Sequence, residues 1–274
     1  MSSENLSAAR PRRLTNRGGP ARTGIFRRSN RKIDMNPSAF KPETPKDLLG
    51  KAGNIATAML ATIAKIKHDP GALFKALLYG GPGTGKTTIA NMIASCLVTS
   101  KWDLESINGR NLTIEVVRDW QKNACYGSLF GGGWKVKVIN ECDLVPIAAQ
   151  DLMLTYLDEL PPRTAVIGTS NEDVAALTAR FQSRFQTIRI PAPAGAEIAR
   201  WLKTKFNLKK QGADWIGQTC CGNIRQALLD ASSLMMTGAL PEKIEMKKPV
   251  CAAWSEAGRK AWQTRQNNLA KGVA

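Results

Sequence analysis

A glycine-rich segment carries the clearest chemical pattern in the sequence. It reads Gly80-Gly81-Pro82-Gly83-Thr84-Gly85-Lys86-Thr87 and matches the spacing G-x-x-x-x-G-K-[ST]. Glycines let backbone N–H groups turn toward phosphate oxygens without a Cβ in the way. Lys86 supplies positive charge for the β and γ phosphates, and the Thr87 hydroxyl suits Mg²⁺. The pattern predicts nucleotide binding by Gly81, Pro82, Gly83, Thr84, Gly85, Lys86, Thr87 and Thr88.

Two further polar residues follow apolar runs that are typical of buried strands. Glu141 comes after WKVKVIN (134–140), and Asn171 comes after TAVIGTS (164–170). Glu141 can orient a water molecule for attack on a phosphate, and the Asn171 amide can reach the γ-phosphate. The alternatives are a surface carboxylate at a strand end and a turn asparagine.

The elements that position these residues alternate along the chain. Besides the apolar run that enters the glycine-rich loop, we expect strands at 102–107, 134–140, 164–170 and 187–191. We expect helices at 53–67, after Gly85, at 113–124 and at 146–160. Alternating strands and helices predict a parallel sheet with crossover helices. Three helices without strands follow, at 195–207, 212–220 and 223–236, separated by Gly212 and Gly222.

The positive charge lies mainly at the two ends of the chain. The net charge is +17, and residues 1–46 hold 11 Lys and Arg against 3 Asp and Glu. Residues 1–36 have few large apolar side chains, so we expect a mobile arm. Its arginines suit contact with nucleic-acid phosphates, and the alternatives are a solvated tail or an organellar transit peptide.

The composition excludes several classes of protein. No run of residues reaches the length of a membrane span, and the N-terminal residues lack the apolar core of a secretory signal. The six cysteines form no C-x-x-C pair and the chain has one histidine, so a zinc site and a disulfide scaffold are disfavoured. We therefore expect a cytoplasmic protein, associated with the nucleoid or, in a eukaryote, with the nucleus.

These motifs together resemble an AAA+ ATPase, and within that superfamily the small subunits of clamp loaders of the replication factor C type. The resemblance covers about residues 46–236 and rests on LLYGGPGTGKTT (77–88), LESINGRNLTIEVVR (104–118), KVKVINECDLVPIAAQDLMLTYLDELPP (135–162), VIGTSNE (166–172), LTARFQSRFQTIRI (177–190) and GNIRQALLDA (222–231). It implies an α/β fold, with a five-stranded parallel P-loop sheet followed by a three-helix lid.

The resemblance also implies roles for individual residues. The loop at 80–88 corresponds to Walker A and binds ATP. Asn140 and Glu141 correspond to the Walker B element, so Asn140 joins Thr87 at Mg²⁺ and Glu141 is catalytic. Asn171 matches sensor 1, Arg184 in Ser183-Arg184-Phe185 matches the arginine finger, and Arg225 matches the sensor 2 arginine.

Three more residues bear on these assignments. Asn108 resembles the polar residue that can hold the Walker B glutamate inactive. Arg180 lies four residues before Arg184 and can instead contact DNA or a partner, whereas Arg189 lies in a strand and has a structural role.

The chain departs from the family pattern at two places. Asn140 stands where the family has an aspartate, so it keeps the shape but loses the charge, and we expect weaker Mg²⁺ binding and slow turnover. Only about 39 residues follow the lid, too few for the collar domain of clamp loaders. Residues 252–269 fit one basic helix, with Trp254 and Trp262 roughly on one face.

We therefore expect four segments: a basic arm (1–45), a nucleotide-binding α/β domain (46–191), a helical lid (192–237) and a short basic tail (238–274). The expected function is an ATP-hydrolysing oligomeric switch, with ATP sites between identical or different subunits, that loads or remodels a replication or recombination protein on DNA. One alternative is a protein-remodelling AAA+ chaperone, for which Tyr126 and Phe130 are candidate pore-loop aromatics. Another is an ATP-binding scaffold subunit with little turnover.

Overall fold

The computed structural model describes residues 37–128, 133–171 and 176–238. Its sheet consists of β1 (Leu73–Tyr79), β2 (Leu104–Asn108), β3 (Lys135–Asn140), β4 (Thr164–Ser170) and β5 (Gln186–Arg189). The strand order is β2-β3-β4-β1-β5, and each neighbouring pair is parallel. The α/β fold with five parallel strands that the sequence predicted is therefore confirmed.

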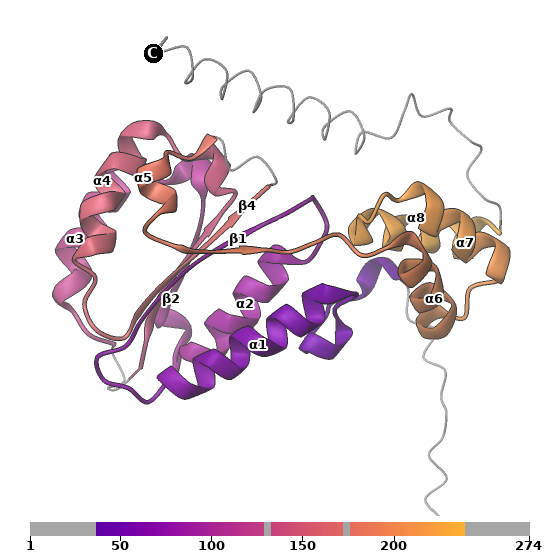
Figure 1. Ribbon diagram of the computed structural model, residues 1–274, viewed down its shortest axis with the longest axis horizontal. Helices are drawn as coiled ribbons and strands as arrows, with labels where there is room; N and C mark the ends of the chain where they lie inside the picture. Colours follow the sequence, from indigo (N-terminus) through magenta and orange to yellow (C-terminus); the bar gives the residue numbers. More distant parts are fainter. Residues whose placement is uncertain (1–36, 129–132, 172–175, 239–274) are drawn as a thin grey trace, which may run out of the picture. The chain divides into compact units, whose positions relative to one another are not determined.

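Helices cover both faces of the sheet (Figure 1). Helices α1 (Lys51–Ile66) and α2 (Lys86–Leu97) pack on one face, and α3 (Ile114–Lys122), α4 (Ile147–Asp158) and α5 (Ala179–Gln182) pack on the other. Adjacent residues of one strand enter opposite cores: Val138 belongs to the first and Ile139 to the second. Because both faces are covered, the central strand β4 is buried at every position, as in other buried parallel sheets, whereas the edge strands β2 and β5 are mostly exposed or half-buried.

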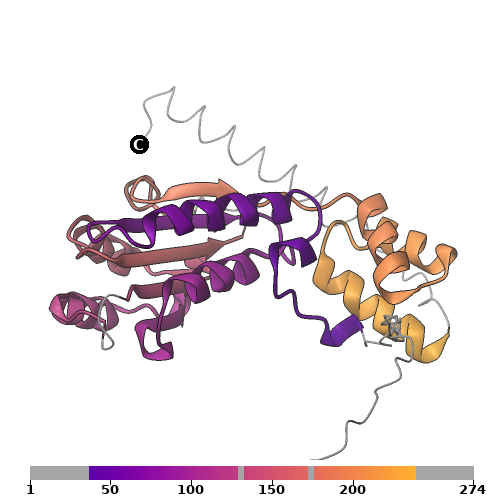
Figure 2. The ribbon, with the colours of Figure 1, turned by 90° about the horizontal axis from the view of Figure 1, so that it is seen from below.

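Three helices follow the sheet and have an apolar core of their own. They are α6 (Gly195–Phe206), α7 (Lys210–Thr219) and α8 (Ile224–Thr237), and Figure 2 shows them, in orange to yellow, as a separate group. Gly195 and Gly217 let α6 and α7 approach closely, since a Cβ on Gly195 would lie 2.2 Å from the Gly217 carbonyl oxygen.

The predicted start of the second lid helix at Gly212 is wrong. Helix α7 begins at Lys210, and Gly212 is a buried residue inside it. Glycine lowers helix propensity by only about 1 kcal/mol, and packing against α6 outweighs that cost. The other helices and strands agree with their predicted ranges to within a few residues.

The segment before α1 packs against the lid helices. Pro37–Ala39 and Pro45–Asp47 form short 3-10 helices. Between them, the Phe40 ring lies 5.4 Å from the ring of Trp201 and 5.9 Å from that of Phe206. The sequence assigned residues 1–45 to an arm, but the part from 37 onward has packed aromatic contacts. Residues 1–36 and the predicted helix at 252–269 lie outside the described residues.

Candidate functional site

The glycine-rich loop connects the end of β1 to the start of α2. Gly85 has a φ of 96°, a left-handed conformation that favours glycine, and α2 begins at the next residue, Lys86. The Lys86 Nζ donates hydrogen bonds of 2.8 Å to the carbonyl oxygens of Gly80 and Gly81, and the residue is 9% exposed. The loop therefore curves around a lysine ammonium at the N-terminus of a helix, a geometry suited to phosphate binding.

Polar residues from the ends of β3 and β4 and from the lid face this loop across one cleft. The cleft is lined by Pro82, Gly83, Thr84, Gly85, Lys86, Thr87, Thr88, Glu141, Thr169, Ser170, Asn171 and Arg225. The carboxyl ends of parallel strands meet at one edge of a sheet, which explains why residues far apart in sequence converge there. Asn171 Oδ1 lies 3.5 Å from Lys86 Nζ.

Asp143 holds Asn171 in place, although its role was not predicted from the sequence. Its carboxylate accepts hydrogen bonds of 3.3 Å from the Asn171 backbone N–H and 3.5 Å from the Asn171 side-chain amide. The Ser170 hydroxyl donates to the same carboxylate at 3.3 Å. A second acidic residue two positions after Glu141 was the available signal. The 3-10 turn Cys142–Leu144 directs that residue toward β4.

Glu141 is paired with Asn108 from the neighbouring strand end. The Asn108 side-chain amide donates a 2.7 Å hydrogen bond to Glu141 Oε2. Glu141 has φ 55° and ψ 54°, a left-handed conformation that is uncommon for a residue other than glycine. The structure thus brings Asn108 and Glu141 into contact, as the predicted role of Asn108 requires.

Asn140 ends β3 beside the cleft and bonds to its strand neighbours. Its amide donates to Ser106 Oγ at 3.1 Å, and the Thr169 hydroxyl donates to its Oδ1 at 3.4 Å. Among the described residues that line the cleft, Glu141 is present and Asn140 is not. Both partners of Asn140 are hydroxyl groups, which can also donate to a carboxylate.

The lid reaches the loop through the start of α8. The Ile224 backbone N–H donates to the Gly83 carbonyl oxygen at 3.2 Å, and Arg225 lines the cleft. Asn223 caps α8 by accepting a 3.1 Å hydrogen bond from the Gln226 N–H. Gly83 has a φ of 71°, and a Cβ there would lie 1.9 Å from Asn223 Oδ1. Any other residue at this position would adopt a strained backbone conformation and would have to displace the Asn223 side chain that caps α8.

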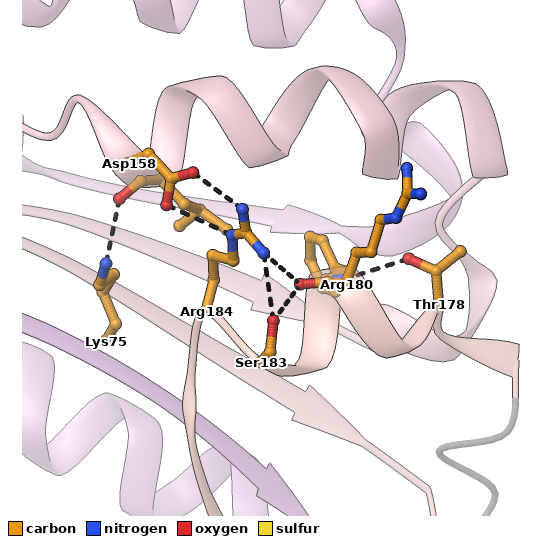
Figure 3. Close-up of polar contacts among 8 residues, drawn as sticks. Lys75, Asp158, Thr178, Arg180, Ser183 and Arg184 are labelled. Carbon is orange, nitrogen blue, oxygen red and sulfur yellow. Dashed lines mark hydrogen bonds and ion pairs between the residues drawn. The ribbon is translucent and has the colours of Figure 1, made fainter.

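Arg184 lies outside the cleft, in the turn between α5 and β5 (Figure 3). Its guanidinium forms an ion pair with Asp158, the last residue of α4, with Nη2 to Oδ2 at 3.0 Å. The hydrogen bond from Arg184 and the nearby charge of Lys75 lower the pKa of Asp158. Tyr126, a predicted pore-loop residue, is 65% exposed, and Phe130 is not among the described residues.

The donor set of the cleft fits Mg²⁺ bound together with phosphates. Within the described ranges, no group of three or more His, Cys, Asp and Glu residues is arranged to hold a metal ion by itself. Mg²⁺ is usually held by one or two protein oxygens together with substrate phosphates and waters. The Thr87 hydroxyl and the Glu141 carboxylate line the cleft and are oxygen donors of this kind. Of the helices in the described part of the chain, none has the length and apolar composition to cross a membrane.

Residues 76–191 match a model of the family described as "ATPase family associated with various cellular activities (AAA)". The matched residues include most of the α/β part of this chain. This match confirms the resemblance to AAA+ ATPases that the motifs indicated.

The similar proteins include "Replication factor C small subunit 2" of two Pyrobaculum species. The chain is 29% identical to that of Pyrobaculum islandicum over 132 residues, which cover 45% of this chain and 40% of the relative. It is also 29% identical to that of Pyrobaculum aerophilum over 151 residues, covering 52% of this chain and 45% of the relative. The chain thus matches less than half the length of these relatives.

Solved structures with the same fold include the "RuvB Holliday junction branch migration motor" of Thermotoga maritima. It superposes with a TM-score of 0.54 at 18% identity, covering 74% of this chain and 69% of that chain. A variant of the same protein gives a TM-score of 0.56 at 19% identity, with the same coverage. At this identity the similarity establishes the fold, an AAA+ P-loop sheet with helices on both faces.

Proposed function

We propose that this chain is an ATP-hydrolysing switch of the clamp-loader type that assembles with its ATP sites between subunits and acts on DNA. In this proposal, Gly81, Pro82, Gly83, Thr84, Gly85, Lys86, Thr87 and Thr88 bind ATP, and Thr87 and Asn140 serve Mg²⁺. Glu141 orients the attacking water, and Asn171 contacts the γ-phosphate. Arg225 contacts the nucleotide from the lid, and Arg184 completes the ATP site of the neighbouring subunit. The partner is a replication or recombination protein in the cytoplasm or nucleus.

One observation carries the proposal: a lysine-centred phosphate loop, a carboxylate, an amide and a lid arginine line a single cleft. Phosphoryl transfer needs positioning and positive charge more than covalent chemistry, and these groups supply both. When bound, Mg²⁺ would neutralise charge on the β and γ phosphates. The similarity to replication factor C small subunits supports the clamp-loader type, and the basic arm supports DNA as the partner.

Within this arrangement each side chain has a separate task. The ammonium of Lys86 draws the terminal phosphates into the loop. Glu141 can accept a proton from water once its hydrogen bond to Asn108 is released. Asp143 fixes the Asn171 amide, so that its orientation does not change during the reaction.

A second candidate is a subunit that binds ATP with little turnover. Asn140 favours it, because an asparagine in the Walker B position adds no negative charge for Mg²⁺. In that case the same cleft holds ATP as a structural ligand, and a partner subunit does the hydrolysis.

A mixing experiment with two inactive variants tests the proposal. Lys86→Ala should abolish ATP binding, measured by fluorescence of a labelled nucleotide, without unfolding the protein. Arg184→Ala should bind ATP normally but lose hydrolysis by on the order of a thousandfold, as for other arginine fingers. Mixed together, the two variants should regain part of the activity, because the intact loop of one then meets the intact arginine of the other.

The control is Arg118→Ala, which removes an exposed arginine from α3 and should leave hydrolysis unchanged. Unchanged nucleotide affinity in Lys86→Ala would refute the assignment of the loop. If the oligomers exchange subunits and no mixture recovers activity, Arg184 does not act on a neighbouring site.

A further inference from the structure

Arg184 is held on its own subunit by several contacts at once. Its Nε and Nη2 donate to the two oxygens of Asp158 at 3.3 and 3.0 Å. Its Nη1 donates to the Arg180 carbonyl oxygen at 3.3 Å and to Ser183 Oγ at 3.2 Å. A guanidinium has five N–H donors, so these bonds use four of them. Among contacts with the described residues, the fifth donor has no partner.

Asp158 is suited to this contact by its position and its neighbours. It is the last residue of α4, and Arg184 lies 26 residues later in the chain, in the turn before β5. Lys75, whose ammonium donates to the Leu157 carbonyl oxygen at 3.1 Å, adds a second positive charge nearby (Figure 3). Asp158 therefore stays ionised and able to pair with Arg184.

Arg180 provides an internal comparison on the same surface. It lies in α5, one helical turn before Arg184, and its side chain is exposed. In Figure 3 it points away from Asp158, and its guanidinium makes no hydrogen bond to any residue that the structure describes. The pairing with Asp158 is thus a property of Arg184 and not of every arginine in this region.

We infer that Asp158 is a positioning residue that holds Arg184 in place until the nucleotide phosphate of a neighbouring subunit displaces it. This inference rests on the proposed function, in which Arg184 completes the neighbour's ATP site. The Nε and Nη2 edge of Arg184 is occupied by Asp158, and Nη1 is bonded to Arg180 and Ser183. A two-donor contact of that edge with a neighbour's γ-phosphate therefore requires exchanging the carboxylate of Asp158 for the phosphate.

The exposure of the pair makes this exchange feasible. The side chains of Arg184 and Asp158 are 31% and 52% exposed, and exposed ion pairs are weak because water screens them. A nucleoside triphosphate carries more negative charge than one carboxylate, so it competes well for the guanidinium. Once the γ-phosphate has left, Asp158 can bind Arg184 again. The position of Arg184 then depends on whether the neighbouring subunit holds a nucleotide with a γ-phosphate.

The variant Asp158→Asn tests the inference in the full chain. Asparagine keeps the shape and one acceptor oxygen but removes the charge. In the presence of a non-hydrolysable ATP analogue, the protein concentration for half-maximal assembly should fall about two- to fivefold, as measured by sedimentation. The nucleotide affinity of the unassembled subunit should not change, because Asp158 does not line the cleft.

Two controls isolate the role of Arg184. Asp151→Asn removes an exposed carboxylate from the same helix and should leave assembly unchanged. Asp158→Asn combined with Arg184→Ala should assemble as Arg184→Ala alone does, because the charge then has no arginine to hold. Asp158→Ser is a second variant in case Asp158→Asn melts at a lower temperature.

Several results would overturn the inference. They are wild-type assembly in both Asp158 variants, weaker assembly in both, and an effect that persists without Arg184. The mixing experiment separates this failure from failure of the proposed function. If Arg184→Ala loses hydrolysis and is rescued in mixtures while the Asp158 variants behave as wild type, only the inference fails. If Arg184→Ala hydrolyses ATP normally, the proposed role of Arg184 fails first.

Discussion

Glu141 has an unusual backbone conformation and is followed by a buried thiol, Cys142, and a second carboxylate, Asp143. A left-handed φ of 55° costs free energy in a side-chain-bearing residue, and such strain concentrates at functional sites. Next to it, burial raises the pKa of Cys142 to about 12, so that thiol stays neutral at physiological pH. The acidic charges at this turn are therefore those of Glu141 and Asp143, one facing Asn108 and the other holding Asn171.

Asn140 gives a prediction at the same scale. Asn140→Asp should lower the Mg²⁺ concentration for half-maximal ATP hydrolysis roughly tenfold, because it adds a negative charge beside the proposed metal position. Ser106 and Thr169 can both donate to the new carboxylate, so the fold should be retained. Hydrolysis rates across a Mg²⁺ titration check this.

A matched control distinguishes the effect of a charge at position 140 from the effect of adding a negative charge anywhere on the protein. Asn54→Asp adds the same charge on an exposed position of α1 and should not change the Mg²⁺ requirement. If Asn140→Asp behaves like this control, the amide of Asn140 serves hydrogen bonding alone.

At the level of elements, local pattern explains most of the fold. The apolar runs ending at Tyr79 and Ser170 are strands without strict alternation, because both faces of the sheet are covered there, whereas the strand ending at Asn140 alternates lysine and valine. The start of α7 could not be predicted, since Gly212 is accommodated by packing rather than by its own preference. The position of Phe40 against Trp201 is likewise a contact between distant segments.

In the candidate site, too, local motifs were predictable from the sequence and contacts between distant segments were not. Motif spacing predicted the loop around Lys86 and the strand ends at Glu141 and Asn171, and the structure brings these three into one cleft. Asp143 was missed because its direction depends on a short turn. The pairing of Arg184 with Asp158 was missed because it joins a turn to the end of a helix 26 residues earlier.

The start of α8 is where the lid contacts the phosphate loop, and it gives a prediction for an element. Asn223→Ala removes the hydrogen bond that caps this helix and should lower the free energy of unfolding by about 1 kcal/mol, measured by urea denaturation. Nucleotide affinity should fall as well, because Ile224 and Arg225 follow directly. Asn223→Asp keeps a capping oxygen and should retain the wild-type stability. Equal stability of the alanine and aspartate variants would contradict this role of Asn223.

At the scale of the whole molecule, the proposed function assigns the two arginines Arg184 and Arg225 to ATP sites of different subunits. Arg225 lines the cleft of its own subunit, whereas Arg184 lies outside it. In the proposed function, a second copy or a related subunit supplies the positive charge opposite Arg225. The net charge of +17 opposes assembly by self-repulsion, so a polyanion such as DNA would favour it.

The basic arm gives the prediction at this scale. Eight arginines lie between residues 10 and 31 with no acidic residue among them. If they bind phosphates, deleting residues 1–36 should weaken DNA binding about equally for all sequences. The slope of log affinity against log salt concentration should become shallower by ~0.9 for each phosphate of duplex DNA that the shortened protein no longer neutralises. Fluorescence anisotropy at several salt concentrations measures both quantities.

Two comparisons make the salt experiment decisive. ATP affinity should be the same with and without the arm, because the cleft is formed by residues from Pro82 onward. Replacing the eight arginines by glutamine, with the length kept, should reproduce the effect of the deletion, since the attraction to phosphates is electrostatic. If neither change alters the affinity or the slope, the arm does not bind nucleic acid. An acidic protein then becomes its better partner, and the protein-remodelling alternative gains support over the action on DNA.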